Sequence, residues 1–235
     1  MNTDLMTLFD IDEARVRAIV SDALSGSDDG ELFLEHSQSE SLMFDNGRLK
    51  SGSFDTEQGF GLRAVAGEAT GYAHAGELSE AALRRAGSAV GAVTRGYSGT
   101  YAAAPKRTNV RLYGDDNPIG QPSFEDKVAL LQTIDAYLRG KDPRVRQVTA
   151  SISASWQIVD IVRADGHRVQ DIRPMTRVNV SVVVGSGDRQ ESGSYGMGGR
   201  RGFGEFIATE SWQHAADESL RQALVNLEAI DAPAG

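Results

Sequence analysis

The chain has 235 residues, of which 40% are hydrophobic and 24% charged, and it contains 26 glycines. This composition is typical of a folded, turn-rich α+β protein, and the length suffices for a sizeable core. The excess of acidic residues gives a net charge of −9, with no basic cluster, and so argues against direct binding of nucleic acid. The chain has no cysteine, which excludes disulfides and thiolate chemistry and favours a reducing compartment.

The beginning of the chain, MNTDLMTLFDIDEARV, is acidic and amphipathic, unlike a secretory signal peptide. No stretch of the sequence approaches the roughly 18 consecutive apolar residues of a membrane span. We therefore expect a cytoplasmic protein that does not contact membranes.

Two helices are predicted in the first half of the chain. Asp10-x-x-Glu13 has the form of a capping box and predicts that a helix begins near Asp10. The apolar stripe of this helix is made by Val16, Ile19, Val20, Ala23 and Leu24. The second helix begins after its cap, Ser79, and turns three apolar residues inward: Leu83, Ala86 and Val90.

Strands are predicted between these two helices. Short strands are expected at 32–36 and 42–44, and the block 48–75 is interpreted as consecutive short strands with glycine at nearly every bend. Asn46-Gly47 and Gly67-Glu68 are the expected hairpin turns.

Residues 92–122 are irregular and contain three prolines, so we expect a functional loop, a partly ordered segment or a linker between lobes 1–91 and 123–235. After Ser123, which caps a third helix, the pattern of the first half recurs. It includes a strand whose buried face carries Val148, Ala150, Ile152, Ala154 and Trp156, a strand of alternating valines over 178–184, and a last helix. Equivalent hairpin turns of the two halves lie about 120 residues apart, which predicts a weak internal duplication. The expected fold is therefore a two-layer α+β structure with helices packed on a largely antiparallel sheet.

The sequence predicts neither a catalytic nor a metal site. The histidines stand far apart, without paired ligand spacing, and each is interpreted as a surface or partly buried residue: His36, His74, His167 and His214. No G-x-S-x-G motif occurs, and Ser192-Gly193-Ser194 is interpreted as a flexible turn.

The glycine-rich run from Gly193 to Gly204 is the main candidate for a functional segment. A nucleotide loop would need a helix directly after it, whereas 203–209 is predicted to be another strand. Two interpretations stay open: a long hairpin connection, or a pliable loop whose exposed backbone clamps an extended peptide. In the second, the candidate peptide-binding residues are Gly193, Tyr195, Met197, Gly198, Gly199, Arg200 and Phe203.

Four long segments of the chain resemble the TldD/PmbA family, whose members are also called modulators of DNA gyrase. They are residues 39–83, RVRQVTASISASWQIVDIVRADG, DIRPMTRVNVSVVV and GGRRGFGEF, and the similarity extends over nearly the whole chain. The resemblance implies kinship with metallopeptidases that digest unfolded peptides, trim a microcin leader and degrade an antitoxin. It also implies pairing of a TldD-type with a PmbA-type (TldE) subunit, and this sequence is more similar to the TldD branch.

In that family an H-E-x-x-x-H helix and a later C-terminal residue hold zinc, and neither is found in this sequence. The resemblance thus implies that residues 1–235 are the N-terminal domain, without a cofactor of its own, and that zinc belongs to a missing C-terminal domain. Such a half would form one wall of a peptide tunnel and contact a PmbA/TldE-like subunit or a second copy. It would be inactive alone, so whether the chain is an enzyme stays open. The alternative is a stand-alone, non-catalytic module that binds peptides or regulates a separate metal-bearing subunit.

Overall fold

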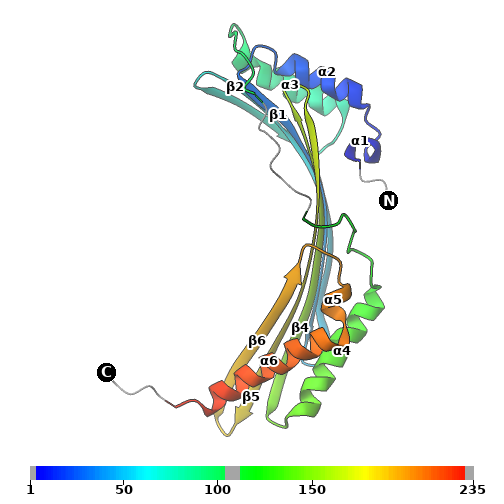
Figure 1. The fold of residues 1–235 in the computed structure, drawn as a ribbon, viewed down its shortest axis with the longest axis vertical. Helices are drawn as coiled ribbons and strands as arrows, with labels where there is room; N and C mark the ends of the chain where they lie inside the picture. The colour runs from blue at the N-terminus through cyan, green and yellow to red at the C-terminus, as the bar shows by residue number, and fades with distance from the viewer. Residues whose placement is uncertain (1–3, 104–111, 231–235) are drawn as a thin grey trace, which may run out of the picture. The chain divides into compact units, whose positions relative to one another are not determined.

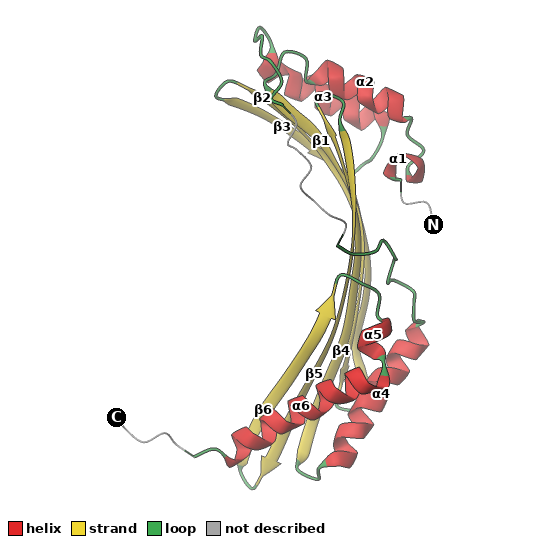
Figure 2. Cartoon of the chain, viewed as in Figure 1, coloured by secondary structure: helices red, strands yellow, loops and turns green. Residues whose placement is uncertain are grey.

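The computed structural model describes residues 4–103 and 112–230. Within these ranges lie six helices and six strands, and the strands form one sheet in the order β3-β2-β1-β4-β5-β6 (Figure 1). The sheet is antiparallel and the helices pack on it (Figure 2), so the expected α+β class is confirmed.

The bounds of the elements follow in chain order. The helices are α1 (Leu5–Leu8), α2 (Glu13–Ala23), α3 (Glu80–Thr94), α4 (Phe124–Lys141), α5 (Gly204–Ile207) and α6 (Thr209–Glu228). The strands are β1 (Asp29–Asp45), β2 (Arg48–Ala66), β3 (Ala69–Ala75), β4 (Val145–Arg163), β5 (Arg168–Ser186) and β6 (Arg189–Gly199).

The chain divides into two compact units. Unit 1 comprises Met1–Gln38, Thr56–Leu112 and Gln157–Arg173, and unit 2 comprises Ser39–Asp55, Tyr113–Trp156 and Pro174–Gly235. Strands β1, β2, β4 and β5 each contribute residues to both units. The units therefore draw on both halves of the sequence and do not coincide with the segments on either side of the irregular connection, part of which lies outside the described residues.

In unit 1, α2 and α3 lie side by side (Figure 1), and the predicted apolar stripe of α2 is buried. The helix does not begin at Asp10, as the capping-box pattern predicted. Its cap is Asp12, whose carboxylate accepts the Arg15 N–H at 2.9 Å. Asp10 instead has a φ of 53° in the turn that follows the short helix α1, which the sequence pattern did not indicate. Ser79 caps α3 as predicted, and the three predicted apolar residues of α3 are buried.

The prediction of many short strands was wrong. The two expected strands at 32–36 and 42–44 are one strand, β1, and the block 48–75 contains only β2 and β3. Both predicted hairpin turns are present, and Gly47 and Gly67 have the positive φ angles of 80° and 58° that such turns require. Other glycines in this block provide room rather than bends: a Cβ on Gly61 would lie 2.6 Å from the Tyr72 hydroxyl. Glycine content therefore predicted breaks where the strand is continuous.

In unit 2, α4 and α6 cover the core formed with the sheet. Ser123 caps α4, and the alternation along β4 and β5 is confirmed, because each predicted inward residue is buried. Phe124, the first residue of α4, is 49% exposed. The core includes Leu131, Ile134, Leu138, Val148, Ile152, Val180, Val182, Trp212, Ala216, Leu220 and Ala223.

Candidate functional site

The glycine-rich run is mostly an edge strand and not a loop. Residues 193–199 belong to β6, which pairs with β5 in an unbroken register from Ser186↔Arg189 to Thr176↔Gly199. Ser192-Gly193-Ser194, predicted to be a turn, lies inside this strand, and the strand predicted over 203–209 is replaced by helix α5. The period of two in β6 was hard to detect, because glycine fills positions on both faces of the strand.

One face of β6 lies against α6. Gly193 touches the helix backbone so closely that a Cβ there would lie 2.2 Å from the Ser219 carbonyl oxygen. The rings of Tyr195 and His214 meet edge to face at 5.3 Å between centroids, and Met197 packs against the core of unit 2. These three candidates from the sequence therefore support β6 from its helix side.

The outer edge of β6, the one that faces away from β5, is covered to different extents along its length. At one end α6 covers it: the Asn226 amide donates to the Ser192 carbonyl at 3.0 Å, and the Ser194 N–H donates to the Gln222 side chain at 3.4 Å. Outward-pointing backbone groups recur at every second residue of an antiparallel edge strand, so those of Gly196 and Gly198 also point away from β5. Within the part of the chain that the structure describes, no group bonds to them, and β6 is the last strand of the sheet.

The residues after β6 have separate roles. Arg200 is exposed, and its guanidinium lies 5.2 Å from the centroid of the Tyr113 ring. Phe203 is only 2% exposed, so its predicted role as a direct peptide contact does not fit its position. The Lys127 ammonium lies 5.3 Å from the Phe203 ring centroid and 2.5 Å from a carboxylate oxygen of Glu40. Phe203 therefore anchors the end of the run in the core of unit 2.

A hollow of about 260 Å³ lies in unit 2. Its lining is Ser39, Glu40, Ser41, Ser153, Ala154, Ser155 and Met175. Met175 directly precedes Thr176, which pairs with Gly199, so the hollow adjoins the end of β6. The hydroxyl groups of the serines that line the hollow can donate and accept hydrogen bonds, so they suit contact with the backbone of a peptide.

The histidines do not come together. His36 lies in β1, His74 in β3 and stacked on Tyr72, His167 beside a turn, and His214 in α6. Within the described ranges 4–103 and 112–230, no three His, Asp or Glu side chains are placed to hold a metal ion. The described residues thus do not fit a zinc site. None of the described helices is long and apolar enough to cross a membrane.

Comparison with known proteins places this fold in a family. Residues 30–93 match the model of the PmbA/TldA metallopeptidase domain 1, and residues 117–227 match that of the PmbA/TldA metallopeptidase central domain. The Metalloprotease TldD homolog of Haemophilus influenzae is 38% identical over 216 residues, covering 88% of this chain and 45% of that protein. Its counterpart in Buchnera aphidicola (subsp. Acyrthosiphon pisum) is 31% identical over 216 residues, with coverages of 88% and 44%.

Solved structures share the fold at low sequence identity. TldE from Thermococcus kodakarensis has a TM-score of 0.70 at 12% identity, over 89% of this chain and 47% of that one. A Thermotoga maritima protein described as a candidate modulator of a DNA gyrase has a TM-score of 0.73 at 14% identity, with coverages of 95% and 49%. The chain belongs to the TldD/PmbA family. It spans about half the length of the curated relatives it matches.

Proposed function

We propose that this chain is the substrate-binding half of a TldD-like zinc metallopeptidase and that it holds an extended, unfolded peptide along the open edge of β6. The observation that carries this proposal is the pair of outward-facing backbone positions at Gly196 and Gly198, which no described group covers. Unpaired strand edges accept extended peptides as additional strands. The proposal is also supported by the metalloprotease naming of the relatives.

The proposed binding uses the peptide backbone. Gly196, Gly198 and Gly199 carry no side chains, so an added strand can approach them whatever its sequence. Arg200, exposed at the end of the strand, offers a charged donor to the peptide. From the helix side, Tyr195 and Met197 hold the edge in place.

Hydrolysis and zinc belong to a further domain in this proposal, and the present chain contributes binding and subunit contacts. As partner we propose a PmbA/TldE-like subunit or a second copy of the chain, which the structural similarity to TldE supports. A reading frame that continues past Gly235 into an H-E-x-x-x-H helix is the expected result. A stop codon there would instead favour the stand-alone peptide-binding module.

The binding edge can be tested with two variants of Gly196. A Cβ at this position meets the flexible ends of the Asn179 and Arg177 side chains, which can move aside. Gly196→Ala keeps the outward N–H, whereas Gly196→Pro removes it, and proline is tolerated on edge strands. Loss of one hydrogen bond should weaken binding about threefold to tenfold in Gly196→Pro relative to Gly196→Ala.

The measurement is fluorescence anisotropy of a short fluorescein-labelled peptide of Gly, Ser, Thr and Val with the 235-residue chain, with circular dichroism as the check on folding. Arg200→Ala should also weaken binding without loss of structure. Equal affinity of the folded proline and alanine variants would remove the edge of β6 from the proposal.

A further inference from the structure

The first described residues of the chain form a short segment that is tightly seated on unit 1. Residues 4–9, here called the N-terminal strap, contain α1, whose Leu5 and Met6 are 1% and 3% exposed. The Asp4 carboxylate caps this helix by accepting the Met6 N–H at 3.0 Å. A four-residue helix has almost no stability of its own, so contacts with the rest of unit 1 must hold it.

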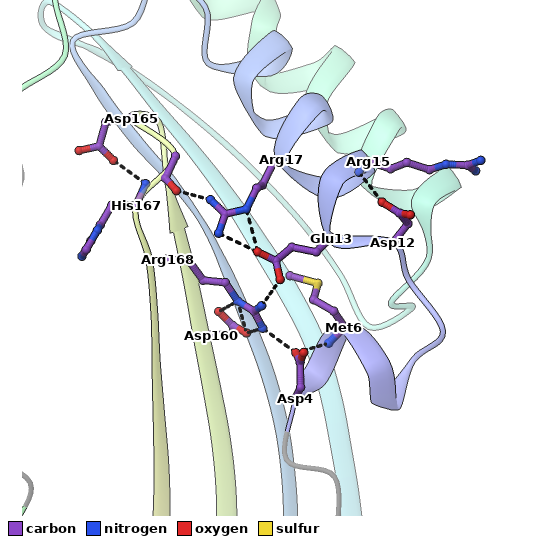
Figure 3. Close-up of polar contacts among 11 residues, drawn as sticks. Asp4, Met6, Asp12, Glu13, Arg15, Arg17, Asp160, Asp165, His167 and Arg168 are labelled. Atoms are coloured by element: carbon purple, nitrogen blue, oxygen red, sulfur yellow. Dashed lines mark hydrogen bonds and ion pairs between the residues drawn. The ribbon is translucent and has the colours of Figure 1, made fainter.

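Arg168 of β5 binds the strap through the Asp4 carboxylate (Figure 3). Its guanidinium bonds to Asp160 of β4 at 2.9 and 3.0 Å, to Asp4 of the strap at 2.6 Å and to Glu13 of α2 at 2.5 Å. Arg17 of α2 shares Glu13, at 2.7 Å. Asp160 is wholly buried and its carboxylate is paired with Arg168, so the guanidinium is held in place on the sheet. From there it binds Asp4 of the strap, and this ion pair between Arg168 and Asp4 is here called the latch.

The latch remains charged in mildly acidic solution. Burial disfavours the ionised form of Asp4, but the hydrogen bonds from Arg168 and the Met6 N–H outweigh it and hold the pKa of Asp4 below its ordinary value of 3.8. The stabilisation is therefore complete above that ordinary value and is lost only as the pH falls through the lowered one. A response nearer neutrality must come from another group.

His36 of β1 is that group. It is 8% exposed, and the Phe9 ring at the end of the strap meets its imidazole at 5.7 Å between centroids. The Gln58 side chain of β2 also acts on this imidazole, while Nδ1 is buried without a partner among the described residues. Among the described residues no charged side chain contributes to the shift of the His36 pKa, which comes from burial and from Gln58. A protonated His36 would thus place an uncompensated charge beneath Phe9.

We propose that the N-terminal strap is a pH-sensitive conformational device, in which protonation of His36 favours release of residues 4–9 from the sheet and Arg168 sets how firmly they close. Release exposes the imidazole to water, together with the surface of unit 1 on which Leu5 and Met6 pack. The imidazole binds a proton more readily when the strap is open than when it is closed. A fall in pH therefore shifts the population toward the open strap.

The direction follows from the burial of His36. Burial lowers the pKa of His36 below its ordinary 6.5, against a smaller opposing effect of the bond to Gln58. Closure is fully favoured above pH 6.5 and weakens as the pH falls from there toward the lowered pKa. One proton limits the change in the open population to about tenfold per pH unit.

Methionine oxidation reports the open state in the intact chain. Met6 is buried, whereas Met43 and Met175 are exposed and serve as internal references. After brief treatment with hydrogen peroxide, peptide mass spectrometry gives the ratio of sulfoxide at Met6 to that at Met43. We expect this ratio to rise severalfold from about pH 7.5 to about pH 5.5, within the one-proton limit.

Three variants distinguish release of the strap on protonation of His36 from a general destabilisation of the protein at low pH. His36→Gln cannot gain charge, so its ratio should not change with pH, whereas His74→Gln, at an exposed histidine of the same unit, should keep the wild-type response. Asp4→Asn loosens the latch without stranding Asp160 and should raise the ratio already at about pH 7.5. A wild-type ratio independent of pH, or a pH response that survives in His36→Gln, would overturn the proposal.

Discussion

Lys127 of unit 2 is a lysine whose side chain is wholly buried. It is 0% exposed, and Glu40 is its only ion-pair partner within the described residues. Glu40→Gln leaves that charge buried and unpaired, and we expect a loss of about 3 to 5 kcal/mol in the free energy of unfolding. Denaturation in urea, followed by circular dichroism, measures this loss.

The matched variant removes both charges. Lys127→Met combined with Glu40→Leu should restore stability to within about 1 kcal/mol of the wild type, because apolar side chains of similar size avoid the cost of desolvating two ions. If the double variant is as unstable as Glu40→Gln, the pair contributes through geometry rather than charge balance, and the prediction fails.

Two residues, Lys127 and Gly196, show which features of the site can be predicted from sequence and which cannot. Lys127 occupies a position of the stripe formed with Leu131, Ile134 and Leu138, and a lysine in that place is the available signal for a buried ion pair. Gly196 belongs to the glycine run, but only the register with β5 shows that its N–H points outward. Which backbone groups remain unpaired is a property of the assembled sheet and cannot be seen in one strand.

At the level of elements, the outer strands β3 and β6 each place a glycine beneath a helix. A Cβ at Gly193 would lie 2.2 Å from the Ser219 carbonyl oxygen of α6, so Gly193→Ala must push the helix and strand apart. We expect a loss of about 1 to 3 kcal/mol in unfolding free energy, typical of overpacking. Gly140→Ala is the control, because nothing lies within 4 Å of a Cβ at this exposed helical position. It should stabilise α4 by about 0.5 to 1 kcal/mol, and equal effects of the two substitutions would refute the packing argument.

The elements were predictable where hydrophobic period and capping agreed. Ser79 and Ser123 begin helices as expected, and the alternation in β4 and β5 matches burial. The prediction failed where glycine indicated a turn but instead allowed close packing, as at Gly61 and Gly193. The element order recurs, with helix, three strands and helix in each half, but the internal duplication stays a prediction.

On the scale of the whole molecule, four long strands contribute residues to both units: β1, β2, β4 and β5. Their continuity bears on whether the two units unfold together. Each of these strands runs without a break from one unit into the other, so loss of unit 1 leaves every one of them with an unpaired continuation. We therefore expect a single cooperative transition. Long strands paired over most of their length are the physical basis of this coupling, and a division into separate halves would not have indicated it.

The test of this coupling uses the positions of the two tryptophans. Trp212 lies in the core of unit 2, whereas Trp156 is the last residue before a segment of unit 1. Trp156→Phe therefore leaves a fluorescence signal, that of Trp212, which reports on unit 2. Gly71→Ala destabilises unit 1, because a Cβ there would lie 2.8 Å from a methyl carbon of Val93 in α3. If the units unfold together, this substitution lowers the urea midpoint of the tryptophan signal as much as that of circular dichroism. If the fluorescence midpoint stays unchanged while the circular dichroism curve splits, unit 1 unfolds on its own, and the continuity of the strands does not couple the units.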